Sequence, residues 1–228
     1  AFTDTGDITA SWDPSTGTLS LSGTATVEDY QAALRSVTYE NNSDDPSSAQ
    51  RGITFSVNDG DTDSNAGTRA IDIGAVNDAS EVDNIETSAL DYTENDVAIE
   101  VSDTINLTDA DDDQLEGATI QITGNYANGE DLLAFADTAD ITASWDANTG
   151  TLNLSGIATV AEYKAALRSV TYKNTSDDPS TDQRSVTFSV DDGDIVSIAG
   201  VRAIDITAVN DASEITNIET SALDYTEN

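Results

Sequence analysis

The residues of this sequence that could do chemistry are carboxylates, because the 228-residue chain contains no histidine, cysteine or methionine. Asp and Glu number 44 against 8 Lys and Arg, which gives a formal net charge of −36. Zinc sites built from His or Cys and the usual His- or Cys-based catalytic arrangements are therefore excluded. Calcium takes six to eight oxygen ligands from carboxylates, amides and backbone carbonyls. The sequence is suited to binding a hard cation.

Acidic and amide side chains gather at four places that recur along the chain. They are residues 107–113, residues 43–46 and 176–179, residues 58–61 and 191–194, and the pairs 77–78 and 210–211. Neither Asp109 nor Asp59 begins an EF-hand loop, because the twelfth position is Ile120 in one case and Ala70 in the other, where Glu is needed. Any calcium site must therefore be assembled from separated loops.

The chain repeats itself with an offset of 133 positions, which carries Trp12 to Trp145 and returns residues 75–95 nearly letter for letter as 208–228. Solenoid repeats run about 20–50 residues, so a period this long is a whole domain. We expect residues 1–79 to be the later part of one module, without its N-terminal strands. Residues 80–211 would be a complete module, and 212–228 the linker and first strand of the next.

Short runs that alternate apolar and polar residues, such as 52–57 and 118–123, have the period of β-strands. They predict an all-β fold in which antiparallel strands form two-layer sandwich modules in tandem. Within the complete module the expected strands lie near residues 90–94, 97–101, 104–108, 118–123, 132–135, 141–146, 151–155, 169–173, 185–191 and 200–208.

One short helix is expected in each module. Thr159 and Glu162 have the spacing of a capping box, and Thr26 and Asp29 take the same positions in the first copy. We interpret this helix as a structural crossover at an edge of the sandwich.

The tryptophans are expected in the core. Ile141, Ala143 and Trp145 alternate onto one face of their strand, and the same pattern holds around Trp12. This favours packing over a sugar-stacking platform.

Strand direction predicts which loops meet, because neighbouring strands of an antiparallel sandwich run in opposite directions. Asn77, Asp78 and Asp45 are expected at the end of one module. The loops 109–113 and 191–194 are expected at the facing end of the next. So many carboxylates at one junction repel each other unless cations lie between them. An acidic surface that keeps a halophilic or marine protein soluble is the alternative, and it explains the clusters less well.

Three segments resemble the calcium-binding elements of cadherin repeats and follow the same order along the module: Glu94 in Tyr-Thr-Glu-Asn, Asp109-Ala-Asp111, and Val76-Asn-Asp78 at the linker. The whole chain resembles the cadherin-like extender repeats of giant bacterial surface adhesins of the RTX type, which carry segments like 33–39 and 55–60. The resemblance implies a cadherin/Ig-like β-sandwich, Ca²⁺ as the cofactor, secretion to the bacterial cell surface, and no enzymatic activity.

The resemblance also implies two calcium junctions that stiffen the array and hold a distal ligand-binding region away from the cell. The first would use Asp45, Asn77, Asp78, Asp109 and Asp111, with Asp192 or Asp194 nearby, and the second Glu94, Asp178, Asn210 and Asp211. Such linkers often place Pro after Asn-Asp-Ala, whereas Ser80 and Ser213 follow here. This difference leaves more of the stiffness to the ions.

The expected partners are calcium and neighbouring repeats of the same chain. A net charge of −36 argues against nucleic acid and against insertion into an anionic membrane. The alternative function is a carbohydrate-binding module, with possible glycan contact at an exposed tryptophan. No carboxylate pair stands out in an apolar segment, as glycosidase chemistry would need.

Overall fold

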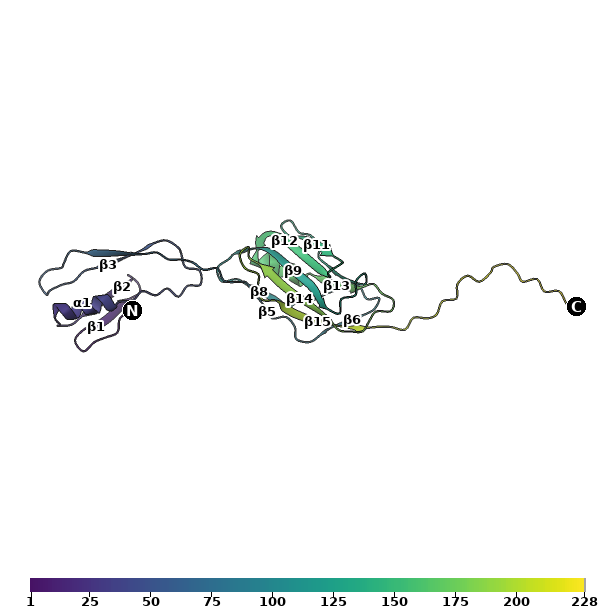
Figure 1. Cartoon of the computed structure of the whole chain (residues 1–228), viewed down its shortest axis with the longest axis horizontal. Coiled ribbons are helices and arrows are strands. Elements are labelled where there is room, and N and C mark those ends of the chain that lie inside the picture. The colour runs from purple at the N-terminus through teal and green to yellow at the C-terminus, as the bar shows by residue number, and fades with distance from the viewer. Residues whose placement is uncertain (228) are drawn as a thin grey trace. The chain divides into compact units, whose positions relative to one another are not determined.

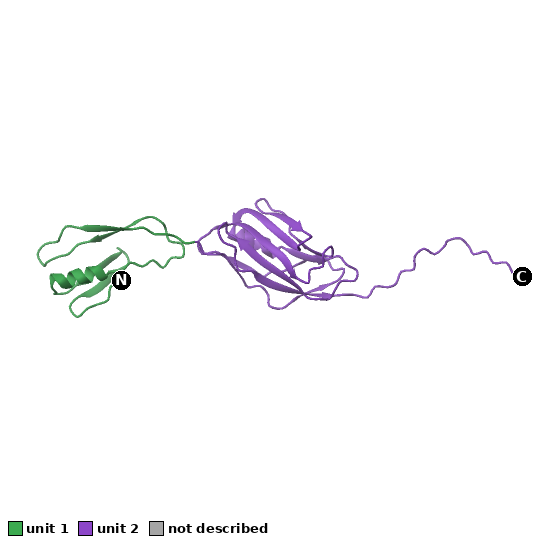
Figure 2. Cartoon of the chain, viewed as in Figure 1, with its two compact units in different colours: residues 1–76 green, residues 77–228 purple. Residues whose placement is uncertain are grey.

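A computed structural model describes residues 1–227 of the chain (Figure 1). Contacts divide the chain into two compact units, residues 1–76 and residues 77–228 (Figure 2). Neither helix within the described residues is long and apolar enough to cross a membrane.

The second unit is a two-layer β-sandwich. Its larger sheet has the strand order β11-β12-β9-β14-β15-β6, made of Thr142–Asp146, Thr151–Thr159, Gln114–Gly124, Arg184–Asp191, Gly200–Thr207 and Leu90–Thr93. The other layer has the order β10-β13-β7, made of Asp131–Ala134, Thr171–Asn174 and Ile99–Glu100. Beside them β5 (Glu81–Asp83) pairs with β8 (Asn106–Thr108). The predicted all-β sandwich is confirmed, although β5 was not foreseen.

One strand pair departs from the predicted antiparallel arrangement. The first strand of the large sheet, β6, runs parallel to the last strand, β15, with Leu90 opposite Ile204 and Tyr92 opposite Ile206. All other strand pairs in the described residues are antiparallel. Because β6 and β15 run in the same direction, the chain enters the large sheet at one end and leaves it at the other.

Alternation along the strands builds the core. In β14 every second side chain is buried, from Arg184 through Val186, Phe188 and Val190. Their partners across the core include Leu133, a fully buried side chain of the smaller sheet. Burial of such apolar area is the main favourable contribution to folding.

A buried polar network fastens the two sheets to each other. Asp131 of β10 accepts hydrogen bonds from Arg184 Nε of β14 at 2.9 Å, from the Tyr172 hydroxyl at 2.5 Å, and from Asn174 Nδ2 at 2.7 Å. Burial, and then the Asp131 carboxylate, raise the pKa of Tyr172 well above its ordinary value. The ion pair of Asp131 and Arg184 is fully shielded from solvent.

The predicted helices are confirmed as α1 (Val27–Ser36) and α2 (Val160–Arg168), each with its capping box. Helix α2 joins β12 of the larger sheet to β13 of the smaller one and buries Tyr163 and Leu167. Helix α2 is therefore a connection between the two layers, as its sequence pattern indicated.

The first unit contains two hairpins and α1. Strand β1 (Thr9–Asp13) pairs with β2 (Thr18–Ser22), and β3 (Arg51–Phe55) pairs with β4 (Gly67–Ile71). Residues 1–76 hold no counterpart of β9, the strand that joins β12 to β14 in the second unit. A sandwich therefore does not form in the first unit. The buried apolar residues of this unit are Ile8 and Ala33.

The expectation for the tryptophans is right for one copy and wrong for the other. Trp145 packs against the core and meets Tyr126 edge to face, with ring centroids 6.2 Å apart. Trp12 is 59% exposed, because its hairpin has no second layer to pack against.

The segment after β15 forms no strand in its described part, residues 208–227. Its apolar side chains are exposed, with Leu223 at 94% and Tyr225 at 86%. In the second unit the matching residues, Leu90 and Tyr92, are held in β6 by pairing with β15.

Candidate cation site

Three carboxylates of the loop after β8 form the centre of an acidic site. Oxygen atoms of Asp109, Asp111 and Asp112 lie within 4.8 Å of one another, and among residues 1–227 this is the one such group of three or more. Asp109 Oδ1 accepts hydrogen bonds from the backbone N–H of Asp111 at 3.1 Å and of Asp112 at 2.9 Å. This local turn gathers the carboxylates on one side of the loop.

The beginning of the second unit is tied to this loop. The backbone N–H of Asp78 donates to both carboxylate oxygens of Asp111, at 3.1 and 3.3 Å. The hydroxyl of Ser80 donates to Asp109 Oδ2 at 2.6 Å, and Ser80 is buried. The serine at the position where the resembling linkers often have proline thus supplies a hydrogen bond that proline could not.

A third segment enters the site from the connection between β14 and β15. Asp192 is 8% exposed, and its Oδ1 accepts hydrogen bonds from the N–H groups of Asp194 at 2.8 Å and Ile195 at 2.7 Å. Its Oδ2 accepts a hydrogen bond from Asn77 Nδ2 at 3.1 Å. Three segments far apart in the sequence therefore meet at one end of the sandwich.

The carboxylates of this site hold their negative charges at close range. Burial and the neighbouring charge of Asp109 raise the pKa of Asp111, although the Asp78 N–H opposes this. Burial, followed by the charges of Asp109, Asp111 and Asp192, raises the pKa of Asp112. Burial opposes ionisation of Asp109 and Asp192 too, but their hydrogen bonds outweigh it and lower both pKa values. A cation would relieve this crowding.

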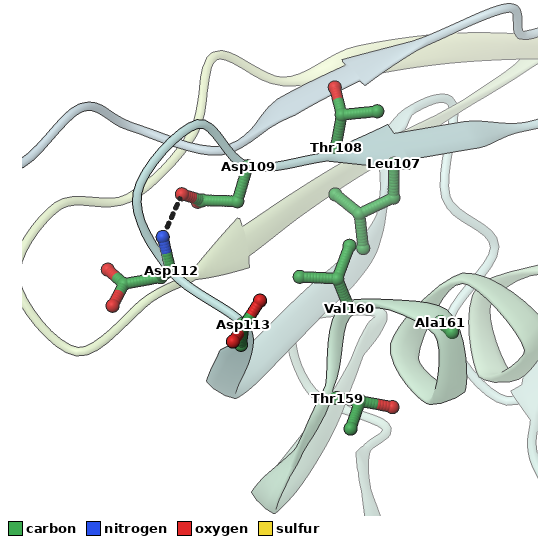
Figure 3. Close-up of a pocket in the computed structure, with 8 residues that line it drawn as sticks. All are labelled: Leu107, Thr108, Asp109, Asp112, Asp113, Thr159, Val160 and Ala161. Atoms are coloured by element: carbon green, nitrogen blue, oxygen red, sulfur yellow. Dashed lines mark hydrogen bonds between the residues drawn. The ribbon is translucent and has the colours of Figure 1, made fainter. Parts of the chain in front are cut away.

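An open hollow of about 500 Å³ lies beside the acidic loop (Figure 3). Carboxylates of the loop flank one side, and apolar side chains near the start of α2 flank the other. The lining residues are Leu107, Thr108, Asp109, Asp112, Asp113, Thr159, Val160 and Ala161. Two members of the acidic cluster, Asp109 and Asp112, thus line this hollow.

The structure brings together most of the residues proposed for the first junction. Asn77, Asp78, Asp109, Asp111 and Asp192 form the hydrogen-bonded site described above.

Two residues of the first predicted set contribute no side chain to this network. Asp194 is exposed and enters it only through its backbone N–H. Asp45 belongs to the first unit, where it is exposed. The prediction missed Asp112, which stands in the same acidic run as Asp109 and could have been included on that ground.

The second predicted set is centred on Glu94, which follows β6. Glu94 is 3% exposed, and its N–H donates to the carbonyl of Thr207 at the end of β15, at 2.9 Å. Both carboxylate oxygens are buried, and neither has a hydrogen-bond partner in the described part of the chain. Buried polar groups are nearly always paired, so this carboxylate requires an explanation.

The other members of the second set lie on loops that start near Glu94. The hydroxyl of Tyr92 donates to the carbonyl of Asn174 at 3.0 Å, which places the end of β13 beside the end of β6. The loop after β13 leads to Asp178, and the chain after β15 leads to Asn210 and Asp211. These three residues are exposed. Asn210 Nδ2 donates locally, to the Asp211 carbonyl at 3.0 Å.

The chemistry of both sets fits a hard cation. An unpaired buried charge is costly, and a divalent ion is a partner that can compensate a carboxylate. The oxygen donors available are carboxylates, amides and backbone carbonyls, which calcium prefers. Glu94 would provide the innermost ligand of the second set, with donors from the exposed loops around it.

Comparison with known proteins gave one match. The chain is 35% identical over 96 residues to halomucin of Haloquadratum walsbyi. The match covers 40% of this chain but only 1% of halomucin. No family model and no solved structure matches the chain.

Proposed function

We propose that this chain is a segment of a long extracellular surface protein and acts as a structural spacer, with calcium bound at the ends of its modules. The parallel arrangement of β6 and β15 supports the spacer role, because it lets the chain enter and leave a module at opposite ends. Modules built in this way extend along the chain when they are repeated. A match to a stretch that makes up 1% of halomucin is consistent with a domain used in very long proteins.

The observation that carries the calcium proposal is the carboxylate of Glu94, buried without a hydrogen-bond partner in residues 1–227. It is independent of the acidic cluster around Asp109, which lies beside the start of the unit. Each end of the sandwich therefore carries a separate candidate cation site. Calcium suits these sites better than magnesium, because it accepts irregular sets of six to eight oxygens.

Calcium binding would order the segments that join one module to the next. Extracellular calcium modules have dissociation constants of about 10⁻⁴–10⁻³ M. Such sites would fill outside a cell and stay empty at cytosolic calcium concentrations. The chain would therefore become stiff only after export.

A calcium titration of the 228-residue chain tests this function. We expect the melting temperature and the maximum dimension from X-ray scattering to rise between about 0.1 and 10 mM calcium, and a chelator to reverse both changes. Sodium chloride at matched ionic strength is the control. If sodium chloride reproduced the whole effect, or calcium had none, charge screening on an acidic surface would explain the composition instead.

The carbohydrate-binding alternative gains no support from Trp145, the tryptophan of the sandwich. Trp145 would have to stand exposed beside a groove, and it packs instead against the core and Tyr126.

A further inference from the structure

Four exposed aliphatic side chains fall within seven consecutive residues, on the connection between β14 and β15 and on the start of β15. Ile195 is 44% exposed, Val196 59%, Ile198 89% and Val201 56%. We call these four residues the aliphatic patch. Exposed aliphatic side chains that cluster in one segment of a domain are candidates for an interaction site.

The other copy of the repeat has polar residues at all four positions. Of the 95 positions related by the offset of 133, 23 differ, and four of these fall within seven consecutive positions at this patch. Ile195, Val196, Ile198 and Val201 correspond to Thr62, Asp63, Asn65 and Thr68. The replacements therefore change one surface of one module as a group.

The conformation of the connection does not depend on these replacements. In the second unit Ser197 N–H donates to the Val190 carbonyl at 2.8 Å, and Val190 N–H donates to Ser197 Oγ at 3.0 Å. In the first unit Ser64 and Val57 make the same two hydrogen bonds at the same lengths. Because the polar version folds in the same way locally, the aliphatic side chains serve something other than the loop itself.

Carboxylates border the aliphatic patch. Asp191 and Asp194 belong to the same connection, and a Cβ built on Gly193 would lie 3.0 Å from the Glu116 carboxyl carbon. The arginines of the neighbouring strands do not offset this charge, because Arg184 and Arg202 are buried and paired with Asp131 and Glu86. The aliphatic side chains of this connection thus have carboxylates close to them, and we call these carboxylates the rim.

We propose that the aliphatic patch docks a cationic amphipathic segment of a partner protein. Such a segment would bury aliphatic side chains against Ile195, Val196, Ile198 and Val201 and place Lys or Arg beside the carboxylates of the rim. A second copy of this chain is a poor fit, because it brings 44 acidic residues against 8 basic ones to the contact. The patch adjoins the candidate cation site, because the Ile195 N–H donates to Asp192 Oδ1, so binding is compared with and without calcium.

Two synthetic helical peptides of equal positive charge test the proposal. One carries leucines along one face at positions i, i+3, i+4 and i+7, and the other has glutamine at those positions. Affinity for the full chain is measured by fluorescence anisotropy, once with calcium and once with chelator. We expect the leucine peptide to bind at least about tenfold more tightly in both buffers, because burial of one aliphatic side chain can supply that factor.

The test variant replaces the patch with polar residues, as Ile195→Thr, Val196→Asn, Ile198→Asn and Val201→Thr together. Asn is chosen at position 196, because Asp191 lies opposite this position and a second carboxylate would be repelled. The variant should keep its melting temperature, because exposed substitutions change stability little. It should lose the preference for the leucine peptide while still binding both peptides through charge. The control variant Val97→Thr removes a valine that is 80% exposed outside the patch, and it should keep the preference.

Three results would overturn the proposal. The first is an equal affinity of the wild-type chain for both peptides. The second is a preference for leucine that survives in the fourfold variant. The third is self-association of the wild-type chain that the fourfold variant abolishes, since a second copy would then be the occupant of the patch.

Discussion

The effect of Glu94→Gln on the free energy of unfolding should differ between chelator and calcium. In the wild-type chain the Glu94 carboxylate is buried and has no hydrogen-bond partner within residues 1–227. Without calcium this charge is uncompensated, so Glu94→Gln should leave stability unchanged or raise it. With calcium, the variant should lose a ligand that reaches the site from inside the module.

The size of the effect follows from binding linkage. At 10 mM calcium, a site with a dissociation constant of about 10⁻⁴–10⁻³ M adds roughly 1.4–2.7 kcal/mol to the free energy of unfolding. Burying an unpaired polar group costs about 1–3 kcal/mol, and a charged one more. The difference in stability between wild type and Glu94→Gln should therefore change by about 2 kcal/mol between chelator and calcium.

Urea unfolding followed by circular dichroism, in chelator and in 10 mM calcium, measures both differences. The control is Asp91→Asn, which removes a charge from an exposed position of the same strand, β6. This control should change the free energy of unfolding by the same amount in chelator and in calcium. If Glu94→Gln also shifted both curves equally, calcium would not bind through Glu94, and the buried carboxylate would need another explanation.

Two further predictions concern the ion pairs of the sandwich. Asp131→Leu should lower the free energy of unfolding by about 3–5 kcal/mol, because it leaves Arg184 buried without its partner. The double variant with Arg184→Met should recover much of this loss, and a single variant that costs less than the double in urea unfolding would contradict the argument. Burial opposes ionisation of Glu86, but the hydrogen bond from Ser102 and the charge of Arg202 lower its pKa from 4.5 to about 2. Stability should thus be complete above about pH 4.5 and fall as the pH drops toward 2, and Glu86→Gln should flatten this slope in acid titrations.

The strand pattern predicted the fold correctly for elements whose buried and exposed faces are set by their own sequence. Strand β14 alternates from Arg184 to Val190 and folds as expected, and α2 begins at Thr159 as its capping box indicated. The exposure of Trp12 could not be predicted from its own hairpin, because burial there depends on a second layer that residues 1–76 do not provide. Alternation predicts which side chains lie on the same face of a strand. It does not predict whether another layer of the protein covers that face.

The candidate site was predictable in its composition and less so in its contacts. Strand direction correctly indicated that Asn77 and Asp78 would meet the loops of Asp109 and Asp192. The role of Ser80 was hidden, because a serine after a linker carries no distinctive signal until its hydroxyl is seen on Asp109. Burial beside Glu94 could not be read from sequence either, since it depends on how β15 and the chain after β13 close around β6.

The acidic side chains of this chain fall into at least three physical classes, and each class responds differently to added ions. Some carboxylates shape turns: Asp13 accepts hydrogen bonds from Ser15 N–H at 2.9 Å and Ser15 Oγ at 2.6 Å, which lower its pKa. These turns need no counter-ion.

Exposed carboxylates such as Asp91 repel each other over a Debye length of about 10 Å at 0.1 M salt, so any salt weakens this repulsion. Glu94 is shielded from diffuse ions by burial, and the proposed calcium ion would compensate its carboxylate directly. Sodium chloride added under constant chelator should therefore stabilise the chain gradually, and calcium should add a saturable increment above it. An increment that persisted in Glu94→Gln would have to come from the Asp109 site.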